Sequence, residues 1–204
     1  MIFEVGIDTL ESDKERNLYT KFFGGYYFNE FIDGYENRVS AINYYLSEKL
    51  KTNIGIVNPF VSFDNHGYML GIDIDNGEFS DVFLHDKTQK TIIAIEVKYH
   101  SNLNIKKDFD SNLKRIKAIR QKHPEYTVHF CILISETKWN AAEKMKGRHD
   151  VSSYSKYEMS YKNEIGLLFW EDLVKLCKSE KVRDYMNYKL NLVNAERSNR
   201  FAKI

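Results

Sequence analysis

Thr91-Ile-Ile-Ala-Ile-Glu-Val-Lys98 is the stretch that decides the fold, because an apolar run here ends in a carboxylate and an ammonium. The side chains of a strand alternate between its two faces, so Glu96 and Lys98 share one face with Ala94. Charged groups at such a position are costly to bury unless they are paired, bind a metal ion or face a cleft. The stretch therefore predicts a buried strand that ends either in an ion pair or in a functional site.

A second carboxylate, that of Asp81, lies in the apolar run that precedes this strand. Fourteen residues separate Asp81 from Glu96. The apolar runs at 80–84 and 91–98, joined by polar residues, are typical of two strands in a hairpin. Asp81 is therefore expected across the hairpin from Glu96. In another register its place would be taken by one of three other acids, Asp75, Glu78 or Asp86.

Two carboxylates and a lysine at one strand end are the parts of a metal-dependent phosphodiesterase. Mg²⁺ prefers hard oxygen ligands and is usually held by one or two carboxylates together with waters and phosphate. Asp81 and Glu96 can supply these carboxylates, and the backbone carbonyl of Val97 is a further candidate ligand. Lys98 would point at the same cleft, where it would orient or deprotonate the attacking water or neutralise the transition state.

The order of the remaining elements is typical of an α/β fold. A helix is expected to begin near residue 34 and to end at residue 50, because apolar side chains recur there at helical spacing. An edge or bulged strand at 54–63, which contains Pro59, and a strand at 68–74 follow it. After the hairpin come a helix at 108–122, a buried parallel strand at 127–135, a short helix near residue 139, a strand at 165–170 and a helix from 171 to about 192. This order predicts a mixed central sheet flanked by helices.

Size and composition indicate one globular domain. The chain has 204 residues, of which 43% are hydrophobic, and contains only two prolines. We expect a domain at 31–193, an N-terminal appendage at 1–30 and a fraying tail at 194–204. No apolar stretch reaches transmembrane length, the start does not resemble a signal peptide, and both cysteines are expected to be buried, so a cytoplasmic protein without a membrane partner is expected. The six histidines and two cysteines have no zinc spacing.

Charge is distributed unevenly along the chain, although the net charge is only +1. Residues 1–97 carry 8 Lys and Arg against 16 Asp and Glu, a net of −8, whereas residues 98–204 carry 22 against 13, a net of +9. The acids would gather around a metal ion and the bases would contact a polyanion. An uneven division of charge between two halves of a chain also arises by chance on solvated surfaces. Six basic residues are candidates for contacts with phosphates, although a solvated helix face explains them equally well: Lys106, Lys107, Lys114, Arg115, Lys117 and Arg120. Three tyrosines would stack on bases of an opened strand or pack inside the protein: Tyr154, Tyr157 and Tyr161.

The spacing of these residues resembles the signature of a known nuclease family. Ser80-Asp81, fourteen residues, then Glu96-Val97-Lys98 is similar to the motif of the PD-(D/E)XK nuclease superfamily, which has the restriction-endonuclease-like fold. Ser80 stands where the motif has proline, and that proline does no catalysis. No Gln-x-x-x-Tyr pattern follows, which weakens the link to the exonuclease branch associated with recombination helicases.

The resemblance covers roughly residues 31–175 and implies an αβββαβ core with Mg²⁺-dependent cleavage of nucleic acid, Mn²⁺ being a substitute. It implies that Asp81 and Glu96 bind the metal and that Lys98 is catalytic. It also implies an accessory role for Glu36 on the first helix, in contact with the metal directly or through water. Compensation of the helix dipole explains an acid in that first turn equally well.

These features favour a Mg²⁺-dependent endonuclease that acts on DNA, as a homodimer if it cuts both strands. By analogy, a chain of this length without a helicase or methylase domain suggests a role in phage defence or restriction. Two alternatives stay open. One is a nuclease that acts on RNA, and the other is a catalytically inactive restriction-endonuclease-like module that binds DNA or a protein partner.

Overall fold

The described part of the chain consists of nine stretches separated by gaps. In the computed structural model these are residues 35–57, 59–65, 80–98, 105–137, 139, 157, 160–176, 180 and 183–191. The predicted appendage, the predicted strand at 68–74 and the predicted tail all lie outside them.

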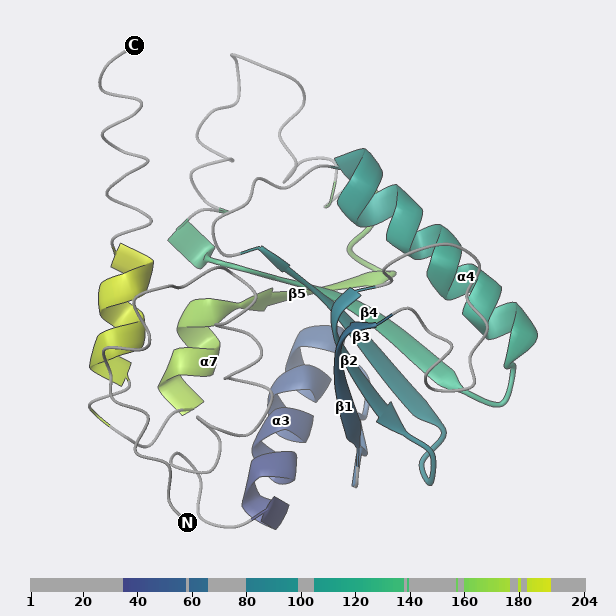
Figure 1. Cartoon of the computed structure of the whole chain (residues 1–204), viewed down its shortest axis with the longest axis horizontal. Helices are drawn as coiled ribbons and strands as arrows, with labels where there is room; N and C mark the ends of the chain where they lie inside the picture. The colour runs from purple at the N-terminus through teal and green to yellow at the C-terminus, as the bar shows by residue number, and fades with distance from the viewer. Residues whose placement is uncertain are drawn as a thin grey trace.

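A mixed sheet of five strands forms the centre of the molecule (Figure 1). Its strands are β1 (Phe60–Asn65), β2 (Ser80–Asp86), β3 (Thr91–Lys98), β4 (Thr127–Ile134) and β5 (Ile165–Phe169), which lie side by side in that order. β2 is antiparallel to its neighbours β1 and β3, and β4 is parallel to both β3 and β5. The predicted α/β class, the hairpin and the buried parallel strand are therefore confirmed.

Helices cover both faces of this sheet (Figure 1). One face packs against α4 (Asn112–Lys122), and the other packs against α3 (Tyr35–Leu50) and α7 (Trp170–Leu176). Residues 183–191 are also helical, and Met186 joins the core on the α3 side. None of the helices in the described ranges is long and apolar enough to cross a membrane.

Alternating side chains of the strands separate these two cores. On β3, Ile92 and Ala94 pack toward α4, whereas Ile93, Ile95 and Val97 pack toward α3. The period of two predicted from the sequence is therefore confirmed. Because Glu96 and Lys98 continue the series of Ile92 and Ala94, both belong to the α4 face.

The segment at 54–63 differs from the single strand that was predicted. Within this segment only the residues of β1, from Phe60 onward, form a strand. This strand pairs with β2 and lies at an edge of the sheet, as expected. The preceding residues bond instead to helix α3, because the Asn43 side chain accepts from the Ile56 amide at 3.0 Å and donates to its carbonyl at 2.7 Å. A side-chain amide can satisfy both backbone groups in this way, and alternation of apolar residues does not reveal it.

The approach to α4 also differs from a simple helix start. The α-helix begins at Asn112, and a π-helical segment, η3 (Ile105–Ser111), comes before it. Asn112 donates from its side chain to the carbonyl of Asp108 at 3.0 Å, and both residues are buried. Segments of π-helix are frequently found at functional sites.

Candidate functional site

The predicted site residues come together at one end of β2 and β3. Val82 pairs with Ile95, and continuing this register by one residue places Asp81 opposite Glu96. Residues directly opposite each other in an antiparallel pair point to the same face of the sheet. That face is the one that carries Lys98 and packs against α4.

Asp81 is tied to the neighbouring strand through the backbone. Its Oδ2 accepts a hydrogen bond of 2.6 Å from the amide of Val97. Asp81 is partly exposed, as is Glu96. The structure therefore holds both carboxylates at the rim of the sheet, on the strand end that the sequence singled out.

Lys98 lies between two carboxylates and is only 7% exposed. Its Nζ lies 2.7 Å from Oε1 of Glu96 and 3.2 Å from Oδ1 of Asp108. Burial lowers the pKa of Lys98, but the charges and hydrogen bonds of Glu96 and Asp108 outweigh burial and raise it above its ordinary value. Lys98 is therefore an ammonium at neutral pH, which suits charge stabilisation better than proton abstraction.

Asp108 is the member of this cluster that sequence reasoning missed. It comes from η3 and is 1% exposed, although its place in the sequence indicated only the start of a helix. The available signal was its position on the inward side of the helix, one residue before the buried Phe109 and four before the buried Asn112. A charge on an inward side needs a partner, and Lys98 is that partner.

Of the alternatives to Asp81, Asp86 has a structural role. Its carboxylate accepts from the amide of Val57 at 2.6 Å and from the amides of Thr88 and Gln89, each at 2.9 Å. It is fully buried at the turn end of β2, far along the strand from Glu96. Asp75 and Glu78 lie outside the described residues, as does the side chain of Glu36.

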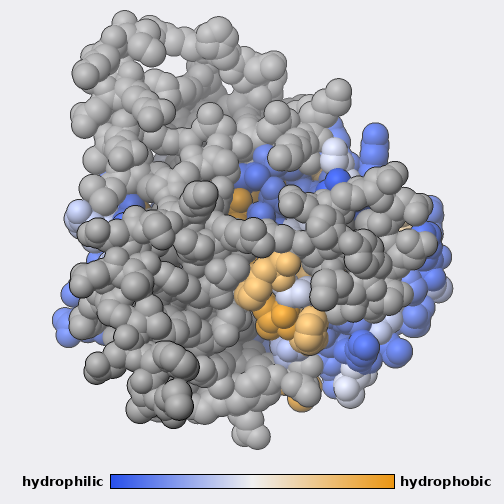
Figure 2. Space-filling view, viewed as in Figure 1, coloured by the Kyte–Doolittle hydropathy of each residue, from blue (hydrophilic) through white to orange (hydrophobic). Residues whose placement is uncertain are grey.

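The basic residues of α4 lie along a hydrophilic flank of the molecule (Figure 2). Lys114, Lys117 and Arg120 are exposed and Arg115 is partly exposed. Lys117 and Arg120 contact residues outside α4: Lys117 lies 3.6 Å from Glu164, and Arg120 donates to the Val128 carbonyl at 2.6 Å. Arg115 donates to the Asn112 side chain within α4. The side chains of Lys106 and Lys107 lie outside the described residues.

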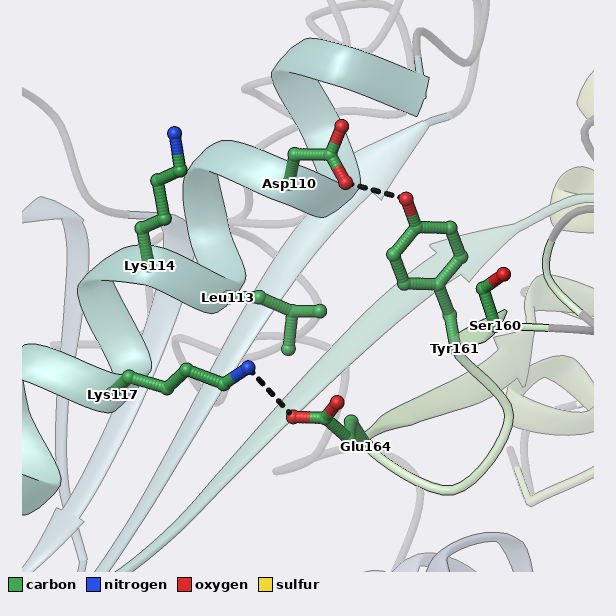
Figure 3. A pocket seen from close by; sticks show the side chains of 7 residues that line it. All are labelled: Asp110, Leu113, Lys114, Lys117, Ser160, Tyr161 and Glu164. Atoms are coloured by element: carbon green, nitrogen blue, oxygen red, sulfur yellow. Dashed lines mark hydrogen bonds and ion pairs between the residues drawn. The ribbon is translucent and has the colours of Figure 1, made fainter.

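A pocket of about 330 Å³ separates α4 from the turn before β5 (Figure 3). Lys117 points across it to Glu164, and the hydroxyl of Tyr161 points to the carboxylate of Asp110, with which it makes a hydrogen bond. Lys114 points away from the Asp110 and Glu164 carboxylates. The two links hold the turn against the helix.

Two of the three tyrosines considered for base stacking are packing residues. Tyr157 and Tyr161 are buried and contact the ring of Phe109 at centroid distances of 6.0 and 4.9 Å. Tyr157 also donates from its hydroxyl to the carbonyl of Ile165 at 2.8 Å. The packing interpretation is therefore confirmed for both, while Tyr154 lies outside the described residues.

No family model, curated protein or solved structure matches this chain. Among the residues with described positions, no group of three or more His, Cys, Asp or Glu side chains is arranged to hold a metal ion. Asp81 and Glu96 supply two carboxylates, which is a number that Mg²⁺ commonly takes from a protein.

Proposed function

We propose that this protein is a Mg²⁺-dependent nuclease that hydrolyses phosphodiester bonds of DNA, with Asp81, Glu96 and Lys98 in its active site. The observation that carries the proposal is the β2–β3 register, which sets Asp81 opposite Glu96 on the face of Lys98. The order α3, β1, β2, β3, α4, β4 supports the accompanying proposal of a restriction-endonuclease-like fold, because it reads αβββαβ.

The donor set fits a small divalent cation. The carboxylates of Asp81 and Glu96 and the backbone carbonyl of Val97 are hard oxygen ligands, which Mg²⁺ and Mn²⁺ both accept. When bound, such an ion lowers the pKa of a coordinated water and neutralises charge on the phosphate. The Val97 amide holds Asp81 in place for this role through its 2.6 Å bond to Oδ2.

Lys98 acts in this proposal as a fixed positive charge. Its ammonium lies beside Glu96, where a phosphate oxygen would gain negative charge in the transition state. Asp108 positions it from the other side at 3.2 Å. This second carboxylate keeps the ammonium oriented when a substrate phosphate competes with Glu96 for it.

The test is cleavage of supercoiled plasmid and of single-stranded DNA in Mg²⁺, in Mn²⁺ and in a chelator. We expect cleavage only with metal, and a loss of at least about a hundredfold in Asp81→Asn, Glu96→Gln and Lys98→Gln. Glu125→Gln removes an exposed carboxylate outside the site and serves as the matched control.

Cleavage that is unchanged in both Asp81→Asn and Lys98→Gln would contradict the proposed mechanism. Cleavage of an RNA panel without cleavage of DNA would instead assign the same site to RNA.

A second candidate is a catalytically inactive module of the same fold that binds DNA or a protein partner. The Lys98–Glu96 contact of 2.7 Å favours it, because the ion pair already satisfies both charges without a metal ion. Binding of DNA with no cleavage in either metal would support this candidate over the first.

A further inference from the structure

A second pocket of about 500 Å³ lies at the opposite end of the parallel strands from Lys98. Its floor includes His129 and Phe130 near the start of β4 and Gly166 near the start of β5. Lys98 pairs with Ile134, at the far end of β4. Four or five residues of strand separate the two places, which is about 13–17 Å.

This pocket is lined by cations. Among the described lining residues, Glu164 is the one carboxylate. Four of them are basic: Lys49, Lys51, Arg120 and Lys162. Glu164 is already paired with Lys117, and Lys49 is paired with Asp172 at 2.8 Å. Lys51, Arg120 and Lys162 are exposed.

Arg120 contributes a fixed positive charge to this pocket. Burial lowers the pKa of His129, and the charge of Arg120 lowers it further. Arg120 is held in place, because its Nη2 donates to the Val128 carbonyl at 2.6 Å. That bond uses one of the five N–H donors of the guanidinium.

Lys51 has an unusual backbone conformation for a lysine. Its φ is 51°, in the left-handed region where glycine is favoured, directly after the end of α3. The helix dipole favours a cation at this end, and Lys49 already supplies one in the last turn. The conformation belongs to the end of the helix, where the Thr52 amide donates to the Ser47 carbonyl at 3.3 Å, and it sets a second lysine at the pocket wall.

We propose that this pocket binds a compact oligophosphate, of the kind carried by a nucleoside triphosphate, through Lys51, Arg120 and Lys162. Its volume lies within the range of small-molecule sites, about 300–1,000 Å³, and it is concave. A nucleic-acid duplex needs an extended surface instead. The pocket therefore suits a small anion, held apart from the end of the sheet that carries Asp81 and Glu96.

The experiment is calorimetric titration of the full chain with ATP and, separately, with inorganic triphosphate, in chelator and at low salt. We expect both to bind, with an affinity that falls as NaCl is added. Equal affinities would show that the phosphates alone are recognised, and tighter ATP binding would show that the nucleoside adds contacts. Absence of binding by both compounds would overturn the proposal.

Three variants separate charge from backbone strain. Lys51→Gln keeps the strained conformation and should weaken binding about tenfold with little change in Tm. Lys51→Gly should weaken binding equally while raising Tm by about 2 °C. Lys90→Gly is the matched control, because Lys90 has a φ of 50° in the β2–β3 turn and does not line the pocket, so Tm should rise with binding unchanged.

Lys162→Gln tests the opposite wall and should also weaken binding. Affinities for ATP and triphosphate that are unchanged in both Lys51→Gln and Lys162→Gln would contradict the assignment. So would binding of DNA that is lost in these variants while neither small anion binds.

Discussion

At the scale of single residues, Asp108 shows what a buried charge requires. It is 1% exposed and lies 3.2 Å from Lys98. Removing one partner of a buried ion pair leaves the other charge without full compensation. Because Lys98 keeps Glu96, we expect Asp108→Asn to lower the free energy of unfolding by about 1–3 kcal/mol in urea titrations.

The control for this variant is Asp172→Asn, which breaks ion pairs near the surface with Lys49 and Lys175. That change should cost less than about 1 kcal/mol. An equal loss in the two variants would contradict the view that burial makes the Asp108 pair strong.

His85 is a second buried polar residue, and it predicts acid sensitivity. It is 2% exposed, and neither ring nitrogen has a hydrogen-bond partner among the described residues. Burial lowers its pKa, with a further contribution from the charge of Lys87. Below about pH 6.5 the unfolded chain therefore binds more protons than the folded one, so stability falls as the pH falls.

We expect the free energy of unfolding to decrease between pH 6.5 and 5, by at most about 1.4 kcal/mol per pH unit for each such histidine. His85→Leu should reduce this slope in urea titrations at several pH values. His129, whose pKa is also lowered by burial, would contribute to the remaining slope. A slope that is the same in His85→Leu and in the parent chain would rule out His85 as its source.

At the scale of elements, the close approach of α3 to β5 depends on Gly166. A Cβ at this position would lie 2.3 Å from Cδ2 of Leu50 and 3.0 Å from Sγ of Cys131. Gly166→Ala should therefore lower the free energy of unfolding by about 1–3 kcal/mol. Gly55→Ala is the control, because a Cβ there has no heavy atom within 4 Å.

A double variant tests the cause. Leu50→Ala alone should destabilise the protein, but Gly166→Ala should cost much less when Leu50 has been shortened. Additive effects of the two substitutions would contradict a clash between these side chains.

The elements that the sequence predicts well are those with simple local patterns. Strands β2 and β3 alternate between two cores, and α4 has a clear apolar face, so their positions follow from the period of the apolar residues. The π-helical segment η3 does not follow from it, because a helical pattern does not distinguish its first turns from those of an α-helix. The bond between Asn43 and Ile56 likewise depends on two elements brought together by the fold.

The residues of the candidate site also differ in how far the sequence predicts them. Asp81, Glu96 and Lys98 were predicted together because one hairpin holds all three. Asp108 enters from another element, and its partner is visible only when α4 is docked on the sheet.

At the scale of the whole molecule, a bound cation should stabilise the folded chain. A ligand that binds only the folded state adds RT ln(1 + [L]/Kd), which is about 1.4 kcal/mol for 10 mM Mg²⁺ and a Kd of about 1 mM. We expect Tm to rise by about 3–5 °C in scanning calorimetry. The rise should disappear in the double variant Asp81→Asn/Glu96→Gln.

NaCl at equal ionic strength controls for general screening of charge. A rise of the same size in the double variant would place the cation elsewhere. This measurement needs no nucleic acid, so it tests the metal site separately from cleavage.

The β2–β3 hairpin has a consequence for the route by which the chain folds. A turn of four residues joins its strands, whereas 28 residues separate the end of β3 from the start of β4. Short loops close faster and at a smaller entropic cost, so we expect the hairpin in the folding transition state and the docking of α4 after it. Asp81, Glu96 and Lys98 would then come together early in folding, and Asp108 would join them later.

In stopped-flow experiments, Val82→Ala in the hairpin should therefore mainly slow folding, and Asp108→Asn should mainly speed unfolding. The reverse pattern would mean that the helix docks first. With the hairpin first, the chain brings Asp81, Glu96 and Lys98 together while much of it is still unfolded, and Lys98 offsets the repulsion between the two acids from the start.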